Sequence, residues 1–196
     1  MADVQLLFPT QLYRAQSRSS NVSLRKACLA IARDDVAGQR WSKENNYHGY
    51  TSYASLNDLT IRAPEIADLK LQLDRHVQAF ARALDIERPA RLRLDSLWIN
   101  VLEADGHHTG HIHPHSAISG TYYVDVPRGA GPIRFEDPRL PLAMASPTRK
   151  PKARPANRRF FEVEPKAGLT LLWESWLRHE VLAGRGRRIS VSFNYS

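Results

Sequence analysis

The 196-residue sequence is poor in cysteine and has no long apolar run. Cys28 is the only cysteine, which excludes a disulfide within the chain and a zinc cluster built from its own thiolates. A metal bound by this chain would therefore need nitrogen or oxygen ligands. The N-terminal segment MADVQLLFPTQLYR is acidic early, and its short apolar run is broken by Pro9. We predict neither a secretory signal nor a membrane span from it, and we expect a cytoplasmic protein.

Basic residues outnumber acidic residues, giving a formal net charge of +8 at pH 7. Much of this excess is local, with six cations between Arg149 and Arg159 and three more between Arg185 and Arg188. Such clusters attract phosphates and acidic partners. The first cluster has no interleaved aromatic residues to stack on bases, so nucleic-acid binding is not the favoured interpretation. The role of the stretch from Arg149 to Arg159 is left open between a lid over a site and a solvated loop.

The first 90 residues favour helices. After the capping candidates Ser20 and Asn21, apolar residues follow at helical spacing: Leu24, Cys28 and Ile31. A second helix begins at Pro64, ends by Pro89 and carries one apolar stripe: Ile66, Leu69, Leu73, Val77, Phe80 and Leu84. Between the helices, ENNYHGYTSYASLNDL is polar and aromatic without a clean period, and we predict a long structured loop there.

From Arg91 onward the sequence changes to short β-prone runs separated by turn residues: RLRLDSLWINVLE, ISGTYYVDV, PIRFED, RRFFEVE, LTLLW and RRISVSFNYS. Many short strands of this kind are typical of a sandwich, jelly roll or barrel. A Pro-rich and basic segment interrupts them, and its composition predicts a mobile loop over 138–158. We predict a single mainly β domain over 1–196, in which 1–90 supplies helical support and a loop, and 91–196 supplies the β core.

Five of the eight histidines crowd into GHHTGHIHPHS, between Gly106 and Ser116. Side chains one residue apart on an extended segment point to the same side, so His111 and His113 can hold one ion. His179 is the only histidine in the C-terminal third and is the candidate for a distal third ligand. Imidazole suits Fe, Cu, Ni and Zn, and three protein ligands with open positions are typical of a catalytic metal site.

Simpler interpretations exist for the same histidines. A His-rich patch can be an exposed loop that scavenges metal without a function, which suits His107 and His108. A lone histidine such as His179 is more often hydrogen-bonded in the core or on the surface than bound to metal. The spacing from His179 to Arg188 argues against that simpler interpretation.

Four motifs follow one another along the chain: WINVLEADGHHTGHIHPHSAISGTYYVDVP, IRFEDP, EPKAGLTLLWESWLRHEV and RRISVSFN. Together with the earlier LFPTQLY and GYTSYASL, they resemble a bacterial family of 2-oxoglutarate/Fe(II)-dependent oxygenases. The resemblance covers nearly the whole chain. It implies a double-stranded β-helix, a jelly-roll and cupin-like fold, with the N-terminal helices as support.

The resemblance also implies roles for individual residues. His111 would be the first iron ligand and His179 the distal one. Arg188, nine residues after His179, would hold the far carboxylate of 2-oxoglutarate, with Ser190 beside it. A guanidinium fork can bind a carboxylate through two parallel hydrogen bonds, which a lysine cannot copy. Tyr122 or Tyr123, one inward and one outward on its strand, and Asn100 are assigned to the same pocket by analogy, with core packing as the alternative.

The chain departs from the wider superfamily at the second ligand. Most such enzymes use two histidines and a carboxylate, and the carboxylate position is here His113. His115 is a competing second ligand. Glu174, near His179 in sequence, is a carboxylate that could support or join the metal site.

The function that follows is an Fe(II)- and 2-oxoglutarate-dependent oxygenase acting on a small molecule or a protein side chain. No catalytic residue is predicted beyond the metal ligands. One alternative is a three-histidine cupin-type metal dioxygenase that does not use 2-oxoglutarate. Another is a non-catalytic metal- or ligand-binding β-sandwich. The sequence does not name the substrate and predicts no membrane partner. It leaves the oligomeric state open, a homodimer included.

Overall fold

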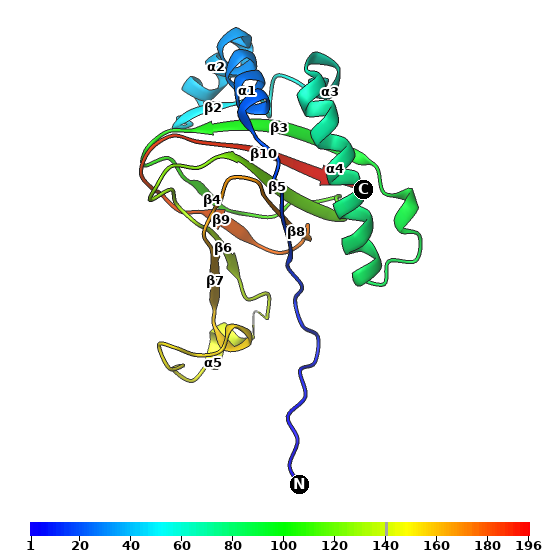
Figure 1. Ribbon diagram of the computed structural model, residues 1–196. Helices are drawn as coiled ribbons and strands as arrows, with labels where there is room; N and C mark the ends of the chain where they lie inside the picture. The colour runs from blue at the N-terminus through cyan, green and yellow to red at the C-terminus, as the bar shows by residue number, and fades with distance from the viewer. Residues whose placement is uncertain (140) are drawn as a thin grey trace.

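The computed structural model describes residues 1–139 and 141–196, and it contains two antiparallel sheets with helices on one side (Figure 1). The large sheet has the order β1-β8-β5-β10-β3-β2 and the small sheet β4-β9-β6-β7. The strands are β1 (Tyr13–Gln16), β2 (Gly49–Thr51), β3 (Leu94–Leu102), β4 (His108–His111), β5 (Ile118–Asp125), β6 (Ile133–Glu136), β7 (Phe160–Val163), β8 (Leu169–Glu174), β9 (His179–Val181) and β10 (Arg188–Tyr195).

Strands β3 to β10 divide evenly between the two sheets. Strands β3, β10, β5 and β8 form the centre of the large sheet, while β4, β9, β6 and β7 form the small sheet. Every strand pair is antiparallel. Eight strands arranged in this way make a jelly roll, which confirms the predicted double-stranded β-helix.

Helices α1 (Val22–Asp34), α2 (Val36–Glu44), α3 (Leu59–Arg62) and α4 (Pro64–Ala83) lie on the outer side of the large sheet (Figure 1). Helix α5 (Leu142–Ala145) lies apart from them, in the connection between β6 and β7, and there are two short 3-10 turns, η1 (Pro89–Arg91) and η2 (Pro155–Asn157). Helix α4 begins at Pro64 as predicted and buries the predicted stripe, except that Leu84 lies just beyond its end and is only partly buried. Each fully buried large apolar side chain contributes roughly 1.5–3 kcal/mol, so this stripe holds the helix on the sheet.

Side-chain alternation along β10 divides the interior into two parts. Ile189, Val191 and Phe193 are fully buried in the core between the helices and the large sheet. The intervening residues face the space between the two sheets, where they line a pocket: Arg188, Ser190, Ser192 and Asn194. Because successive side chains of a strand point to opposite faces, one strand supplies both the core and the pocket.

The N-terminal region is less purely helical than the sequence predicted. Strand β1 adds an edge strand beside β8, with Tyr13 opposite Leu172, and β2 adds the other edge beside β3. The predicted long loop therefore contains a short strand, because Tyr50 and Thr51 pair with Val101 and Asn100. None of the described helices is long and apolar enough to cross a membrane.

The basic loop projects from the body of the jelly roll. It joins β6 to β7 and carries α5 at its far end (Figure 1). Residue 140, within the predicted mobile loop 138–158, lies outside the described residues. The mobility of this loop and the single-domain organisation over 1–196 stay predictions.

Candidate metal centre and its pocket

Three histidines meet between the two sheets. Strand β4 pairs with β9 so that His111 lies opposite His179. His113 follows two residues beyond His111, where its backbone N–H donates to the carbonyl of Ser175 at 3.0 Å. The ring centroids are 4.4 Å apart for His111 and His179, 5.1 Å for His111 and His113, and 5.2 Å for His113 and His179. One ring nitrogen from each lies within 4.8 Å of the others, a separation suited to a shared ion.

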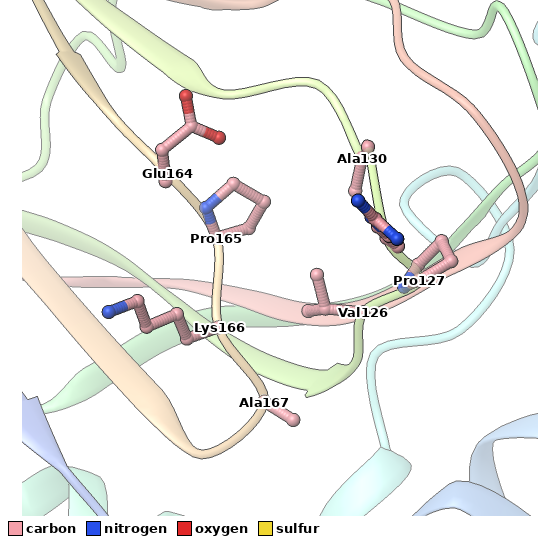
Figure 2. A pocket seen from close by; sticks show the side chains of 9 residues that line it. Val126, Pro127, Ala130, Glu164, Pro165, Lys166 and Ala167 are labelled. Atoms are coloured by element: carbon pink, nitrogen blue, oxygen red, sulfur yellow. The ribbon is translucent and has the colours of Figure 1, made fainter.

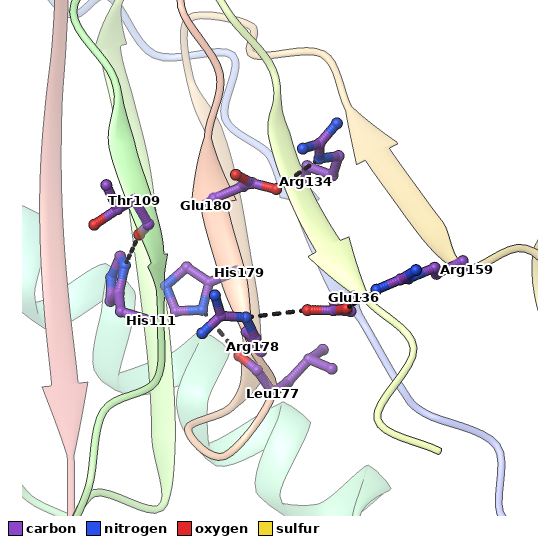
Figure 3. Close-up of polar contacts among 9 residues, drawn as sticks. All are labelled: Thr109, His111, Arg134, Glu136, Arg159, Leu177, Arg178, His179 and Glu180. Carbon is purple, nitrogen blue, oxygen red and sulfur yellow. Dashed lines mark hydrogen bonds and ion pairs between the residues drawn. The ribbon is translucent and has the colours of Figure 1, made fainter. Parts of the chain in front are cut away.

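Backbone carbonyls orient two of the three rings. Nδ1 of His111 lies 2.7 Å from the carbonyl of Thr109, and Nδ1 of His179 lies 2.9 Å from that of Leu177 (Figure 3). A carbonyl can only accept, so each Nδ1 carries the proton and each Nε2 is left with its lone pair. Second hydrogen bonds of this kind fix the tautomer and ring direction of metal-binding histidines.

Two of these imidazoles are held neutral. Burial lowers the pKa of His179 to about 3, with His111 nearby as the second cause. Burial also lowers the pKa of His113 to about 4, again with His111 as the second cause. Both rings therefore keep a free lone pair at neutral pH, which is the form that binds a metal.

The carboxylates of Glu180 and Glu136, on the small sheet, are paired with arginines. Glu180, next to His179, accepts from Nε of Arg134 at 2.7 Å, and Glu136 accepts from Nε of Arg178 at 3.0 Å (Figure 3). Neither belongs to the described group of residues that could share an ion with His179. Among the described residues, the group that could share an ion therefore consists of three imidazoles and no carboxylate.

A pocket of about 900 Å³ opens beside the histidines. All three line it, together with the predicted Asn100, Ser190 and Arg188. Asn100, Ser190 and Arg188 are buried, being 2%, 4% and 4% exposed. The structure thus brings six of the seven predicted site residues to one cavity, large enough for a cosubstrate and a small substrate.

The seventh residue, Tyr122, is a correction. Its ring lies in the core between the helices and the large sheet, and its hydroxyl donates to Oδ1 of Asn21 at 2.6 Å. Tyr123 is the tyrosine that lines the pocket. The strand alternation was expected to place one tyrosine on each side, and the pairing of β5 with β10 and β8 decides which one faces inward.

Arg188 is a buried cation without a described anionic partner. Its guanidinium donates from Nη1 to the carbonyl of Gly131 at 3.0 Å and lies 5.8 Å from the ring centroid of Tyr123. Its Nε has no partner among the described residues, and no described acid forms an ion pair with it. A buried charge is costly unless it is paired, so the pocket is suited to an anion that would supply the pair.

A second buried donor in the pocket wall also lacks a described partner. Nε1 of Trp173 has no hydrogen bond, and its ring centroid lies 4.6 Å from that of His179. Buried polar groups are almost always satisfied, by protein, water or ligand. Two unsatisfied donors on one pocket wall therefore fit a ligand with several acceptor oxygens, as 2-oxoglutarate has.

Tyr47 and His108 complete the end of the pocket near Arg188, and sequence reasoning missed both. The hydroxyl of Tyr47 lies 2.8 Å from Nε2 of His108 and 3.1 Å from Oδ1 of Asn100. His108 had been interpreted as a scavenging surface residue. The structure corrects this, because its ring is half-buried and lines the pocket while His107 is exposed. No spacing signal links Tyr47 to His108, since 61 residues separate them.

The two remaining candidates lie outside the histidine group. His115 is exposed in a turn with a φ of 69°, and it is absent from the described group that could share an ion. Glu174 is at the end of β8, opposite Ile118, and neither joins that group nor lines the pocket. The geometry therefore favours His113 over His115 as partner of His111.

A smaller hollow of about 360 Å³ is separate from the histidine pocket. It lies between the loop after β5 and the loop before β8, and Glu164 and Lys166 are among its lining residues (Figure 2). It shares no lining residue with the histidine pocket. No group of metal-binding side chains is described there, so we assign it no chemistry.

The half-buried position of His108 beside Arg188 predicts a pH-dependent stability. Burial, followed by the positive charge of Arg188, lowers its pKa to about 3. An unfolded histidine titrates near pH ~6.5, so between about pH 3 and 6.5 only the unfolded chain binds this proton. The free energy of unfolding should fall as the pH falls below about 6.5, and His108 should contribute about 1–2 kcal/mol of that loss by pH ~5.

Denaturation of the metal-free protein with urea at neutral and mildly acidic pH measures this effect. The His108→Gln variant should lose less stability on acidification than the unchanged chain. His107→Gln, at the exposed neighbouring position, is the control and should keep the full loss. An equal loss in the His108→Gln variant would show that His108 is not held neutral by the fold.

The sequence and the fold were compared with known proteins. The model of a family described as "Putative 2OG-Fe(II) oxygenase" matches residues 96–194. No curated protein matches the chain. Among solved structures, a Pseudomonas putida prolyl-4-hydroxylase is similar with a TM-score of 0.56 and 13% identity, over 95% of this chain and 92% of that one.

Two further solved structures are similar over part of their own length. EctD from S. alaskensis, solved with 2-oxoglutarate and 5-hydroxyectoine, has a TM-score of 0.60 and 13% identity, over 95% of this chain and 72% of that one. A 2OG-Fe(II) oxygenase family protein from Burkholderia pseudomallei matches over 62% of this chain and 52% of its own length, with a TM-score of 0.48 and 17% identity. The chain thus spans about half the length of that relative.

The family match covers half of the chain and contains all three histidines and Arg188. At these identities the structural similarities support the fold alone, which is the double-stranded β-helix. The predicted family, enzyme class and cofactors Fe(II) and 2-oxoglutarate are thereby confirmed. The chain belongs to this family of 2OG-Fe(II) oxygenases.

Proposed function

We propose that the protein oxidises its substrate at an Fe(II) ion held by His111, His113 and His179, with 2-oxoglutarate held by Arg188. The observation that carries this proposal is the buried Arg188, which lines the same pocket as the three histidines and has no described acid beside it. In a three-histidine dioxygenase without 2-oxoglutarate, the same arginine would be expected to pair with an acid of the protein. The 2-oxoglutarate mechanism is therefore the favoured one.

Each residue has a task that follows from its position. Arg188 would bind the far carboxylate through parallel charge-assisted hydrogen bonds, and Ser190, two residues along β10 on the same face, would add a hydroxyl. The side chain of Asn100 is held in place by two hydrogen bonds: its Oδ1 accepts from Thr51 at 2.9 Å, and its Nδ2 donates to Ser192 at 3.1 Å. It would therefore offer a positioned polar group to the bound ligand.

Tyr123 also lines the pocket. Tyr123 is 2% exposed, and burial raises the pKa of its hydroxyl to about 12, so it stays neutral beside Arg188. The bound iron and 2-oxoglutarate would supply oxidative decarboxylation coupled to oxidation of a substrate C–H bond, chemistry that no side chain of this chain provides. The protein contributes binding and orientation.

An anaerobic titration tests the proposal. Fe(II)-loaded protein should develop the visible metal-to-ligand charge-transfer absorption of chelated 2-oxoglutarate, and under air it should release succinate. Bound iron with no such absorption would reject the 2-oxoglutarate mechanism in favour of the three-histidine dioxygenase. Failure to bind Fe(II) at all would instead favour a non-catalytic β-sandwich.

The proposal includes the class of substrate and the cellular location of the protein. The pocket volume suits a small molecule or one side chain of a protein as substrate. We place the activity in the cytoplasm, which accords with the single cysteine. Cell fractionation with an antibody to the chain checks this location.

A further inference from the structure

The far end of the pocket is shaped by a β-bulge in β3. Strand β10 pairs Tyr195 with Leu94 and Asn194 with Ser96, so Asp95 has no partner of its own. An extra residue of this kind re-aims a side chain that strict alternation would send to the opposite face. Asp95 and Ser96 accordingly both line the pocket, although they are consecutive in sequence.

Asp95 is the only carboxylate among the described residues that line this pocket. It takes part in no described ion pair or side-chain hydrogen bond, although the chain carries a net charge of +8. Arg188 is the only arginine or lysine among the same lining residues. The pocket therefore carries an exposed carboxylate, Asp95, at one end and a buried guanidinium, Arg188, at the other.

Two aromatic rings, those of Trp98 and Tyr53, line the same pocket as Asp95. Trp98 is 8% exposed, and its ring centroid lies 5.2 Å from that of Tyr53 with the two planes at 72°. Two rings at this angle form a corner, and both line the pocket. The faces of tryptophan and tyrosine attract cations within about 6 Å, and cages of aromatic rings bind ammonium groups in this way.

Trp98 and Asp95 lie on the side of the histidines away from Arg188. Arg188 lies opposite Leu102 on β3, so seven residues of β3 separate that level from Asp95, roughly 23 Å at the rise of a strand. The Trp98 ring lies 5.8 Å from that of His113, between these two ends. A molecule held at Asp95 and Trp98 would therefore approach the histidines from the side opposite Arg188.

We propose that this corner is the substrate subsite and that it binds a small molecule carrying an ammonium group, primary to quaternary. Asp95 pairs with the positive charge, and the rings of Trp98 and Tyr53 stabilise it by cation–π contact. Neutral analogues lose both interactions, and acidic ones are repelled by Asp95. The identification of this ligand as the substrate rests on the proposed oxygenase function, whereas the cation site itself does not.

The test uses two probes of equal shape that differ in charge. Choline carries a trimethylammonium group, and 3,3-dimethylbutan-1-ol replaces its nitrogen with carbon. Calorimetric titration of the metal-free protein should give an affinity for choline about tenfold or more above that for the neutral alcohol. Asp95→Asn should lower the choline affinity about tenfold and leave that of the alcohol unchanged.

Two further variants keep the result interpretable. Asp68→Asn removes the same charge at an exposed position on α4 outside the pocket, and it should bind choline as the unchanged chain does. Tyr53→Leu removes one ring at a position 61% exposed, so the fold should be kept, and choline affinity should fall several-fold. Equal affinities for the two probes, no choline binding, or a choline affinity indifferent to both Asp95→Asn and Tyr53→Leu would overturn the proposal.

The outcomes separate this inference from the proposed function. Charge-selective binding of choline without a charge-transfer absorption would retain the cation site and reject the oxygenase centre. The absorption without charge-selective binding would retain the centre and reject the cation site. Each proposal can therefore fail alone.

Discussion

His179→Ala should lose Fe(II) affinity by more than about 100-fold, measured by anaerobic titration of the metal-free protein. Losing even an outer partner of a metal ligand costs about 10- to 100-fold, and this change removes a ligand outright. His179 is 4% exposed and its Nδ1 is fixed by the carbonyl of Leu177, so its Nε2 is held in place as a ligand atom. His113→Ala should have a comparable effect.

The matched control is His115→Asn, in the same histidine-rich segment. Asparagine tolerates the φ of 69° found at this residue, so the turn should be kept. Fe(II) binding should be unchanged in this variant. If His115→Asn lost the metal and His113→Ala retained it, the assignment of the second ligand would be reversed.

Arg188→Met should weaken 2-oxoglutarate binding by about 100-fold or more while Fe(II) binding is retained. Truncation of one partner of a buried, hydrogen-bonded charge pair costs about 2–5 kcal/mol, which corresponds to roughly 30- to 5,000-fold in affinity. The charge-transfer absorption of the Fe(II)-loaded variant should therefore appear only at much higher 2-oxoglutarate concentration. Arg188→Lys should restore little of the 2-oxoglutarate affinity, because the ammonium group of lysine cannot make the two parallel hydrogen bonds of a planar guanidinium.

The stability of the same variant distinguishes a binding role from a structural one. Without ligand, Arg188 is a buried charge that no described acid compensates. Replacing such a charge by an apolar side chain of similar volume is often neutral or stabilising. The melting temperature of ligand-free Arg188→Met should therefore be unchanged or higher. A large drop in melting temperature would mean that Arg188 serves the fold through Gly131.

If Arg188→Met raises the melting temperature and weakens 2-oxoglutarate binding, the pocket gives up folding stability in order to bind its ligand. The unpaired Arg188 and the unsatisfied Nε1 of Trp173 both cost folding energy in the empty protein. Binding of 2-oxoglutarate should recover part of that energy. The ligand should accordingly raise the melting temperature of the iron-loaded protein more than that of Arg188→Met at equal concentration.

The sequence by itself determined the features that depend on local periodicity. The apolar stripe from Ile66 to Phe80 predicted α4, and the short β-prone runs predicted the strands of the core. The spacing of His111 and His113 also predicted that their rings would meet, because extended backbone repeats every second residue. The ordered motifs added the family and, through it, the iron and 2-oxoglutarate.

Only the tertiary structure decided how distant segments meet. Pairing of β4 with β9 brings His179 opposite His111, and the register of β5 places Tyr123 rather than Tyr122 in the pocket. The bulge at Asp95 reverses the face that alternation predicts. Register, bulges and the contact of Tyr47 with His108 arise from long-range pairing and packing, which no local pattern encodes.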